Sequence, residues 1–531
     1  MQNPSILNPE SFLGFEANAN LQQGNYHIDI PVLKEGEQYR FHFDATACIG
    51  CHSCEVACNE QNNNDSDVKW RRVGEMNTGT FPAMTQLFNS MSCNHCIDPE
   101  CLKGCPTQSY IKFDNGIVFH DDDTCIGCQY CTWNCPYEVP VFNHDRGIVT
   151  KCHMCHDKLA NNQTPACVQT CPGAAIEVET FNVQQWLTKD MYEQGIAPCL
   201  PDVNITKPTT RYTLPKMDEN EEVIPADDFH IKPNHPEWPL IFMTVLTQIS
   251  LGGFVALIGG EFLNFFGFNL ALPNLFIILA IFLPAALGLP LSALHLGRPI
   301  LALTAMKNYK TSWLSREAIA LGIYTGGLSL LVLMYFLELS FGYKFFVELL
   351  VLPIGIYGIY AQSMIYRVKA RPSWNKEATT KTFFGVGYIG FLLTSSCLSL
   401  MNEAPSANIL ITTLLFLSFY KIALLNKQTL FYKNLGNKHK NFYQLNKTKQ
   451  LYEEFFSSQS KYRKLTLYIG SLALPILALL FNAQGDSTFA GYLLALAVIV
   501  SLISELIGRY LFYVTAVSQG LAGNFFVGSQ R

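Results

Sequence analysis

Polar and apolar residues divide the chain into two halves. The first 238 residues are mostly polar, whereas residues 239–517 consist of long apolar runs separated by polar loops. Eight of these runs approach the ~20 residues that a helix needs to cross a bilayer. The pattern therefore predicts an all-α bundle of eight membrane helices, near residues 239–262, 272–294, 318–340, 345–366, 382–401, 407–425, 465–481 and 489–516.

Basic residues gather on one side of this predicted bundle. The loops after the second, fourth and sixth runs hold eighteen Lys and Arg residues, whereas the opposite loops hold only Lys344. Cytoplasmic loops of membrane proteins are enriched in Lys and Arg. We therefore expect these loops, both termini and the polar half on the cytoplasmic side of a bacterial inner membrane.

The N-terminal residues and the net charge narrow the class of protein. The first 24 residues have no basic start, apolar core or twin arginine, so we expect no export signal. The net charge of −5 disfavours nucleic acid as a partner. Without export, the 18 cysteines are not expected to form a disulfide framework, which leaves metal binding.

Sixteen of the cysteines form four groups in the polar half, and three of the groups end in Cys-Pro. A compact C-x2-C-x2-C loop supplies three ligands to one iron–sulfur cube, and the fourth cysteine binds the other cluster of a pair. Four groups therefore predict four [4Fe–4S] clusters in an α+β, ferredoxin-like domain of two two-cluster units. The groups are Cys48, Cys51, Cys54 and Cys58; Cys93, Cys96, Cys101 and Cys105; Cys125, Cys128, Cys131 and Cys135; and Cys152, Cys155, Cys167 and Cys171.

Structural zinc is the alternative metal for these cysteine groups. A zinc-stabilised scaffold would have no redox role. Zinc sites, however, use two separated C-x2-C pairs and need no third cysteine at the next step. His95, His153 and His156 lie inside the groups and are expected to be loop residues, since the cysteines already complete the clusters. Cys199 and Cys397 fall outside and are expected to be inert thiols.

The remaining segments suggest domain boundaries. The stretches GIVFHDD (116–122) and AAIEVETF (174–181) predict strands of small antiparallel hairpins packed on the clusters. Prolines and the acidic stretch MDENEE favour an irregular strap before the membrane half. The expected organisation is an extension (1–40), a four-cluster domain (41–185), a strap (186–238), a membrane anchor (239–517) and a tail (518–531).

Histidines in the membrane half indicate the electron carrier. Only His295 and His439 are present there, and His439 lies in a basic loop. A bis-histidine haem is therefore not expected, and a quinone (menaquinone or ubiquinone) is the predicted carrier. His295 ends the second run and Glu317 opens the third, where a histidine can exchange a proton with quinone and a carboxylate can pass it on. These two are the predicted quinone-site residues, with Arg298 orienting Glu317 or the loop; ordinary polar helix ends are the alternative.

An electron-fed transporter or ion pump is the alternative from another functional class. The membrane half has no run of carboxylates and no broken helices in matching halves, which disfavours it. Glu505 and Arg509 are spaced i,i+4 in the eighth run and are expected to pair with each other. A role in proton traffic is the alternative for this pair.

With these motifs in view, the chain resembles a fusion of two subunits of the dimethyl sulfoxide reductase family. Residues 40–185 are similar to the iron–sulfur subunit in all sixteen cysteines, and residues 239–517 to the eight-helix anchor through HLGRP, SWLSRE and GRYLFY. The resemblance implies a non-catalytic electron-transfer and anchor subunit of anaerobic respiration. Its partners would be membrane lipid, the quinone pool and a separate molybdopterin catalytic subunit. His295 and Glu317 match the quinone-site histidine and glutamate of that family.

The resemblance also implies which cysteines share a cluster. Each cluster would take three cysteines from one group and the fourth from another. The implied sets are Cys48, Cys51 and Cys54 with Cys171; Cys152, Cys155 and Cys167 with Cys58; Cys93, Cys96 and Cys101 with Cys135; and Cys125, Cys128 and Cys131 with Cys105.

Two features differ from the family pattern: the subunits are fused, and about forty residues precede the first cysteine. The predicted cytoplasmic face also differs from the exported dimethyl sulfoxide reductases and is similar to that of sulfite-oxidising membrane complexes. The family resemblance favours quinol-driven reduction of an S- or N-oxide, and the cytoplasmic face makes the quinone-reducing arm of a sulfite dehydrogenase the alternative.

Overall fold

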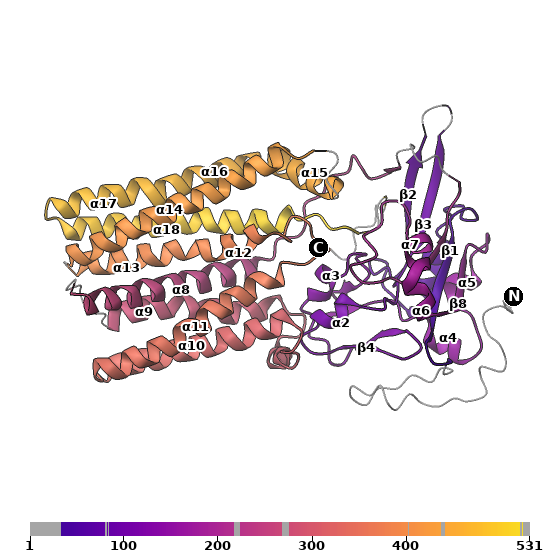
Figure 1. Cartoon of the computed structure of the whole chain (residues 1–531), viewed down its shortest axis with the longest axis horizontal. Helices are drawn as coiled ribbons and strands as arrows, with labels where there is room; N and C mark the ends of the chain where they lie inside the picture. The colour runs from indigo at the N-terminus through magenta and orange to yellow at the C-terminus, as the bar shows by residue number, and fades with distance from the viewer. Residues whose placement is uncertain are drawn as a thin grey trace.

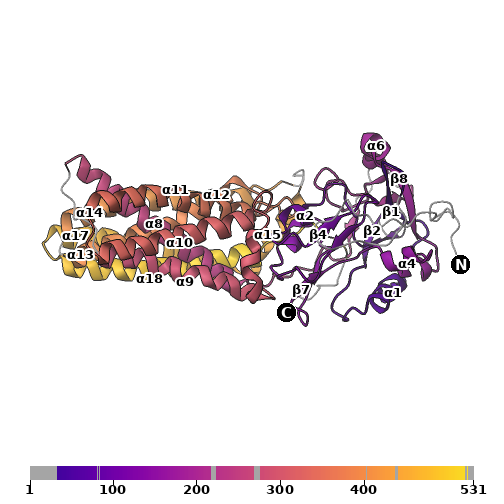
Figure 2. The same ribbon diagram turned by 90° about the horizontal axis from the view of Figure 1, so that it is seen from below.

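The computed structural model describes residues 33–79, 82, 84–216, 223–267, 275–401, 403–436, 441–520 and 523 of the chain. His439, most of the expected N-terminal extension and most of the expected tail lie outside the described residues. Two regions lie end to end: a rod of aligned helices, and a region of short strands and helices (Figures 1 and 2). These are the all-helical and α/β regions that the sequence predicts.

Short strands frame the cysteine-rich region. Along β1 (Glu37–Asp44) polar and apolar residues alternate, which directs Tyr39, Phe41 and Phe43 into the core. β1 is the central strand of a sheet ordered β8–β1–β9, and β2 that of a sheet ordered β10–β2–β3; β4–β5 and β6–β7 form separate hairpins. The bounds are β2 Arg72–Thr78, β3 Thr85–Met91, β4 Tyr110–Lys112, β5 Val118–His120, β6 Val141–Asn143, β7 Ile148–Thr150, β8 Ile176–Asn182, β9 Arg211–Thr213 and β10 Ile224–Pro225.

Both predicted strand segments are strands, but one has a distant partner. Residues 116–122 contain β5 of a local hairpin, as expected. Residues 174–181 overlap β8, which pairs antiparallel with β1 more than 130 residues earlier instead of forming a local hairpin. The proline-rich strap also does more than cover the domain, because its strands β9 and β10 each add an edge to one sheet.

Short helices carry many of the cysteines. α1 contains Cys54 and Cys58, whereas α2, α3 and α5 contain Cys101, Cys131 and Cys167. The cysteines of one group thus lie partly on a loop and partly on the following helix turn. The bounds are α1 Ser53–Asn62, α2 Glu100–Gly104, α3 Tyr130–Asn134, α4 His156–Ala160, α5 Ala166–Gln169, α6 Val183–Gln185 and α7 Met191–Gln194.

Eight helices of the described chain are long and apolar enough to cross a membrane, as the sequence predicts. Three spans depart locally from α geometry, through 3₁₀ turns at Ser292–His295 and Gly385–Gly387 and a π-helical turn at Ile469–Ala473. The seventh span is longer than the predicted 465–481. The spans are α8 Trp238–Phe265; α9 Leu275–Leu291, extended by a 3₁₀ turn to His295; α10 Trp313–Phe336; α11 Phe341–Ile365; α12–α13 Glu377–Leu400; α14 Ala404–Lys433; α16–α17 Ser457–Ala483; and α18 Ser487–Val514. The loop helix α15 covers Phe442–Gln450.

Helix α8 is the centre of the bundle. In its most apolar window 83% of the residues are buried, against 28% for α9. Glycines let the α12–α13 span approach it closely: a Cβ on Gly252 would lie 2.0 Å from the Gly387 carbonyl oxygen, and a Cβ on Gly390 2.0 Å from the Gly253 nitrogen. Small residues of this kind allow membrane helices to pack by direct backbone contact.

The Gly252→Val substitution should separate α8 from the α12–α13 span. Overpacking of this kind costs about 1–3 kcal/mol, or more where backbone must move. We expect a lower unfolding temperature of the detergent-solubilised protein. Gly259→Val on the same helix is the matched control, because a Cβ there meets nothing within 4 Å. An equal loss of stability in both variants would show that the close contact is not the cause.

Candidate functional site

The sixteen grouped cysteines gather into four sets of four. Three of the sets, which become sites I to III, each line one pocket. In the fourth, Cys128 and Cys131 interact electrostatically with Cys105 and Cys125. Each set combines three cysteines of one sequence group with the fourth of another. We name them site I (Cys48, Cys51, Cys54, Cys171), site II (Cys58, Cys152, Cys155, Cys167), site III (Cys93, Cys96, Cys101, Cys135) and site IV (Cys105, Cys125, Cys128, Cys131).

The cysteine loops share a backbone conformation that wraps around these spaces. In the two 2-2-3 groups, Gly50 and Gly127 have φ of 66° and 68°, and His52 and Gln129 have φ of 59° and 57°. The backbone N–H two residues after a cysteine donates to its sulfur at 3.4 Å in three loops, at Cys93, Cys125 and Cys152. Donors aimed at sulfur stabilise thiolates, which is the form that binds iron.

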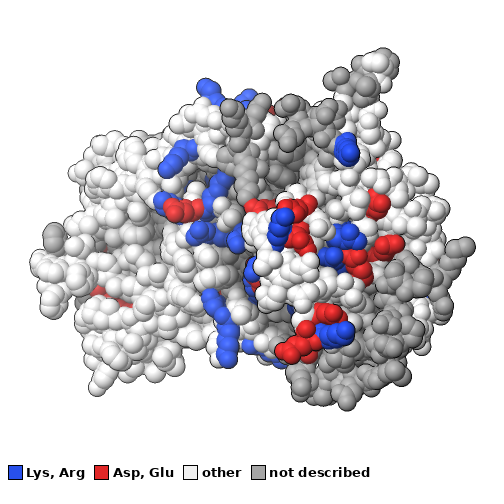
Figure 3. Space-filling model, turned by 45° about the vertical axis from the view of Figure 1, so that its right-hand side comes forward, with Lys and Arg blue, Asp and Glu red and all other residues white. Residues whose placement is uncertain are grey.

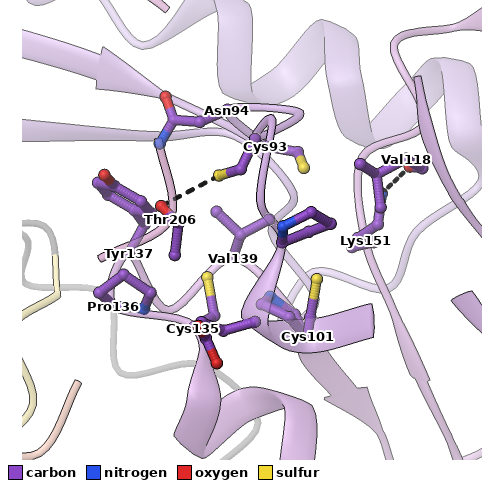
Figure 4. A pocket seen from close by; sticks show the side chains of 14 residues that line it. Cys93, Asn94, Cys101, Val118, Cys135, Pro136, Tyr137, Val139, Lys151 and Thr206 are labelled. Atoms are coloured by element: carbon purple, nitrogen blue, oxygen red, sulfur yellow. Dashed lines mark hydrogen bonds between the residues drawn. The ribbon is translucent and has the colours of Figure 1, made fainter. Parts of the chain in front are cut away.

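The spacing of the sulfurs fits a cluster better than a single ion. Four Zn–S bonds of about 2.3 Å would hold the sulfurs within about 4 Å of one another. Among the residues that the structure describes, no three Cys, His, Asp or Glu side chains converge closely enough to hold one metal ion. At site III, Cys93, Cys101 and Cys135 instead surround a common space closed by Pro136 and Val139 (Figure 4). The residues therefore fit iron–sulfur clusters.

Arg71 joins sites I and II. Its side chain is 2% exposed and interacts with Cys54 of site I and with Cys167 of site II. Burial alone would lower the pKa of Arg71, but these thiolates outweigh it and raise the pKa above its usual value. The guanidinium is held by hydrogen bonds to Ser90 and Ser92, at 3.1 and 2.9 Å. A fixed positive charge therefore lies between two groups of thiolates.

His95 and Lys151 join sites II and III. The Val118 backbone N–H donates to His95 Nδ1 at 3.0 Å, so the ring proton resides on Nε2, which faces Cys152 Sγ at 4.0 Å. Burial, aided by the charge of Lys151, lowers the pKa of His95 well below its usual value, so this ring is neutral. Lys151 lines site III and donates to the Cys152 carbonyl at 2.8 Å. His95 thus lies between two sites, a position that its place in a cysteine loop did not reveal.

Tyr110 joins sites III and IV. It is 1% exposed and interacts with Cys101 of site III and with Cys131 and Cys105 of site IV. Together with Arg71, His95 and Lys151, it places the four sites in one row, I–II–III–IV. At the start of the row Cys51 is exposed, and Ile49 beside it is 66% exposed.

The other end of the row rests on the membrane bundle, at the loop between α9 and α10. The Arg298 N–H donates to the Ile126 carbonyl at 3.1 Å, and Asn308 Nδ2 donates to the Cys105 carbonyl at 2.8 Å. Gly297 packs directly on Gly147, where a Cβ would lie 2.0 Å from the carbonyl oxygen. The loop therefore binds the backbone on both sides of site IV, at Cys105 and at the Cys125–Cys128 loop.

Aromatic side chains complete this junction. Trp133, two residues after Cys131, lies 5.8 Å from Tyr366, 5.4 Å from Trp374 and 6.3 Å from Tyr513 between ring centroids. The hydroxyls of Tyr366 and Tyr513 are hydrogen-bonded. Site IV is thus shielded from water by rings from both regions.

The three predicted quinone-site residues have separate partners. Arg298 donates to the Asp122 carbonyl at 2.8 Å, so it binds the cysteine domain and not Glu317. His295 Nδ1 is hydrogen-bonded to the Ser292 carbonyl, which places the ring proton on Nδ1 and leaves Nε2 as an acceptor. Glu317 is buried, bonds with Gln362 and interacts with Tyr130. Within the described chain, no hydrogen bond joins His295 to Glu317.

Glu505 and Arg509 of α18 interact electrostatically, but the direct partner of each lies on another helix. Glu505 pairs with Lys421 of α14 at 3.0 Å, and Arg509 instead donates to Gln248 at 2.9 Å. Gln248 in turn donates to Gln362 at 2.6 Å, which connects this network to Glu317. Sequence spacing within one helix finds i,i+4 partners, but it does not find a lysine on another helix.

Comparisons with known proteins agree with this division of the chain. A family described as 4Fe-4S dicluster domain matches residues 84–180, and one described as DMSO reductase anchor subunit (DmsC) matches residues 232–514, over half of the chain. The first half is similar to the B subunit of the anaerobic dimethyl sulfoxide reductase of Haemophilus influenzae, with 36% identity over 181 residues, 32% of this chain and 87% of that protein. The corresponding B subunit of Escherichia coli is 36% identical over 179 residues, 32% of this chain and 86% of that protein. The iron-sulfur subunit of formate dehydrogenase-O of Escherichia coli is 38% identical over 164 residues, 28% of this chain and 55% of that protein.

If sites I and II each bind an iron–sulfur cluster, the Arg71→Met substitution should lower the reduction potentials of both. A unit charge at about 7 Å in an effective dielectric of about 20 contributes about 2.4 kcal/mol, or roughly 100 mV per electron. Redox titration of the purified full chain followed by electron paramagnetic resonance measures this shift. Arg71→Lys is the control and should restore most of the potential, because it retains the charge. Unchanged potentials in Arg71→Met would exclude the electrostatic role.

Proposed function

Because the chain belongs to the family of dimethyl sulfoxide reductase anchor subunits through its membrane half, we propose that it connects a membrane quinone to a catalytic subunit through four [4Fe–4S] clusters. Electron transfer and membrane anchoring in a molybdoenzyme complex follow from both family matches and from the relatives of the first half. We propose in addition that the clusters number four and that the membrane carrier is a quinone, which binds near His295 and Glu317.

One observation carries the proposal: the row of cysteine sites runs from an exposed end to the α9–α10 loop, which is flanked by the predicted quinone residues His295 at the end of the α9 span and Glu317 in α10. Iron–sulfur clusters, when bound, exchange single electrons. The sixteen cysteines hold the clusters, and Arg71, His95, Lys151 and Tyr110 fix the spacing between neighbouring sites. At the membrane end, Tyr130 interacts with both Cys128 of site IV and Glu317, so one side chain separates the cysteines from the carboxylate.

His295 and Glu317 supply the proton chemistry of this proposal. Oxidation of a quinol releases two electrons and two protons. With Nδ1–H held by the Ser292 carbonyl, His295 presents Nε2 as the acceptor for a quinol hydroxyl proton. Glu317 accepts or relays the second proton, and Gln362 orients its carboxylate. Arg298 holds the loop that carries His295 against the cysteine domain.

The basic loops support a cytoplasmic location of the cysteine domain. Lys and Arg side chains gather where the almost uncharged bundle meets the cysteine domain (Figure 3). Under the positive-inside rule this face is cytoplasmic. Because His295 and Glu317 lie near the same face, protons would be released on the side that receives the electrons. The proposed quinone reaction is therefore non-electrogenic.

The direction of electron flow separates two candidate activities. The family similarity favours quinol oxidation that serves reduction of an S- or N-oxide. The cytoplasmic face favours the second candidate, in which the chain receives electrons from a sulfite dehydrogenase and reduces quinone. Sulfite-dependent quinone reduction in native membranes, with and without the gene, distinguishes the two. Gene-dependent activity supports the second candidate, and its absence in iron-replete membranes supports the first.

The His295→Ala substitution should reduce quinone-linked turnover roughly 10²-fold or more, since a proton acceptor is lost. Iron content and the paramagnetic signals of the clusters should not change, because His295 touches none of the cysteine sites. His235→Ala in the exposed strap is the matched control and should turn over normally. Normal turnover of His295→Ala would remove the proposed quinone site, whereas loss of iron would indicate a structural role.

The exposed end of the row is the proposed docking surface for the catalytic subunit. Ile49 and Val56 are 66% and 62% exposed beside the cysteines of site I. Ile49→Asp together with Val56→Lys should weaken the complex at least tenfold, because apolar anchors are lost at the centre of the contact. Size-exclusion chromatography of the purified complex measures the loss. Met84→Asp changes an equally exposed apolar residue that is not part of site I, and it should have no effect.

A further inference from the structure

Two buried glutamates meet at the end of the bundle that lies away from the cysteine domain. Helices α8, α10 and α11 bring together Glu261, Tyr335 and Glu348. The Tyr335 hydroxyl lies 3.0 Å from Glu348 Oε1 and 3.4 Å from Glu261 Oε1. Glu261 is 3% exposed and Glu348 is not exposed at all. Neither residue has a role in the proposed electron transfer.

The two carboxyl groups together lack a hydrogen-bond donor for their remaining oxygen atoms. Both approach the same Tyr335 hydroxyl and interact with each other, yet the second oxygen of each, Oε2, has no donor partner. A tyrosine hydroxyl has one proton and satisfies one carboxylate at a time. Two ionised carboxylates in such contact repel each other strongly in a buried environment. A proton between the two carboxyl groups would remove this repulsion and pair both oxygens.

Charges around the pair are consistent with a single bound proton. Lys344 lies 4.1 Å from the centre of the Tyr335 ring and interacts with Glu261. α8 carries no other charged residue, α10 carries its charges at the opposite end, and Glu338 after α10 is exposed. With one proton, the glutamate pair has a charge of −1, which Lys344 balances. Lys344 lies in the first turn of α11, four residues before Glu348.

We propose that Glu261 and Glu348 form a proton-binding site that holds one shared proton and exchanges it with the aqueous phase opposite the cysteine domain. Glu261 lies about one turn from the end of α8, and Lys344 is partly exposed, so this phase is close. The site binds and releases a hydrogen ion without any redox change. It behaves as a coupled acid pair with one proton between two carboxyl groups.

The site is separate from the proposed quinone chemistry. Tyr335 and Glu317 are 18 residues apart on α10, which corresponds to about 27 Å along the helix axis. The inward-facing residues between them include Phe254, Leu328 and Leu331, all fully buried and apolar. The hydrogen-bonded hydroxyls of Tyr324 and Ser250 lie on the Glu317 side of this apolar layer, so we expect protons at the glutamate pair not to exchange with Glu317.

Infrared spectroscopy of the purified full chain tests the shared proton. We expect a protonated-carboxyl band of the glutamate pair at neutral pH, separate from any band of Glu317, that is lost in Glu348→Gln, where the amide donates to Glu261 in place of the proton. Glu261→Gln should lose the same band and serves as the second variant if the first fails to fold. Glu338→Gln, an exposed carboxylate at the same end, is the matched control. A band that persists in both pair variants overturns the proposal.

The dependence of the unfolding temperature on pH provides a second readout. A shared proton stabilises the fold at low pH, and this contribution is lost as the pair deprotonates at higher pH. The wild-type chain should therefore lose stability toward alkaline pH more than Glu348→Gln, whose amide does not titrate. Equal pH dependence contradicts the proposal, as does stabilisation of the wild type by sodium ions, which would identify a cation as the ligand. Quinone-linked turnover should stay at the wild-type level in Glu348→Gln, and a decrease would contradict the separation of the two sites.

Discussion

The contact between the α9–α10 loop and site IV is the constraint on which the rest of the structure depends. Its hydrogen bonds end on backbone carbonyls of the cysteine domain, at Ile126 and Cys105 among others, and Gly297 packs directly on Gly147. Because carbonyls and glycines have no rotamers, the cysteine-domain side of this contact fixes distance more strictly than flexible side chains would. The cysteines nearest the membrane, Tyr130 and Glu317 are therefore held in one fixed order, and any side chain at Gly297 would increase the separation across which electrons must pass.

The row of sites also requires that the negative charge of its buried thiolates be offset. Four sets of thiolates in a low-dielectric interior repel one another and oppose reduction, since every added electron increases the negative charge. Arg71 and Lys151 offset this charge between neighbouring sites, and the neutral His95 adds a donor without a further charge. The same side chains fill the space between sites, so electrostatics and spacing are set by the same residues.

Local sequence patterns predicted the features that depend on local chemistry. The apolar runs predicted eight spans, which the structure contains, and the cysteine spacing indicated iron–sulfur ligation before any fold was known. Long-range partners were not predictable in this way. The pairing of β8 with β1, the Lys421–Glu505 ion pair and the docking role of Arg298 each join residues at least 80 positions apart. Arg71 lies in an ordinary polar stretch, and only the fold brings it between two groups of cysteines.

Because the two regions belong to one chain, the junction between them does not have to hold two separate subunits together. Between separate subunits, a contact as small as the α9–α10 loop on site IV would have to overcome the entropy of association. In a single chain the strap makes this an intramolecular event with a high effective concentration. The strap is itself anchored at both regions: Thr206 bonds to Cys96 of site III, and Asp227 accepts a hydrogen bond from Tyr443 in the loop after α14. The glycine contact, the hydrogen bonds and the rings around Trp133 therefore act within one chain, whose covalent connection supplies the proximity that separate subunits would have to gain by association.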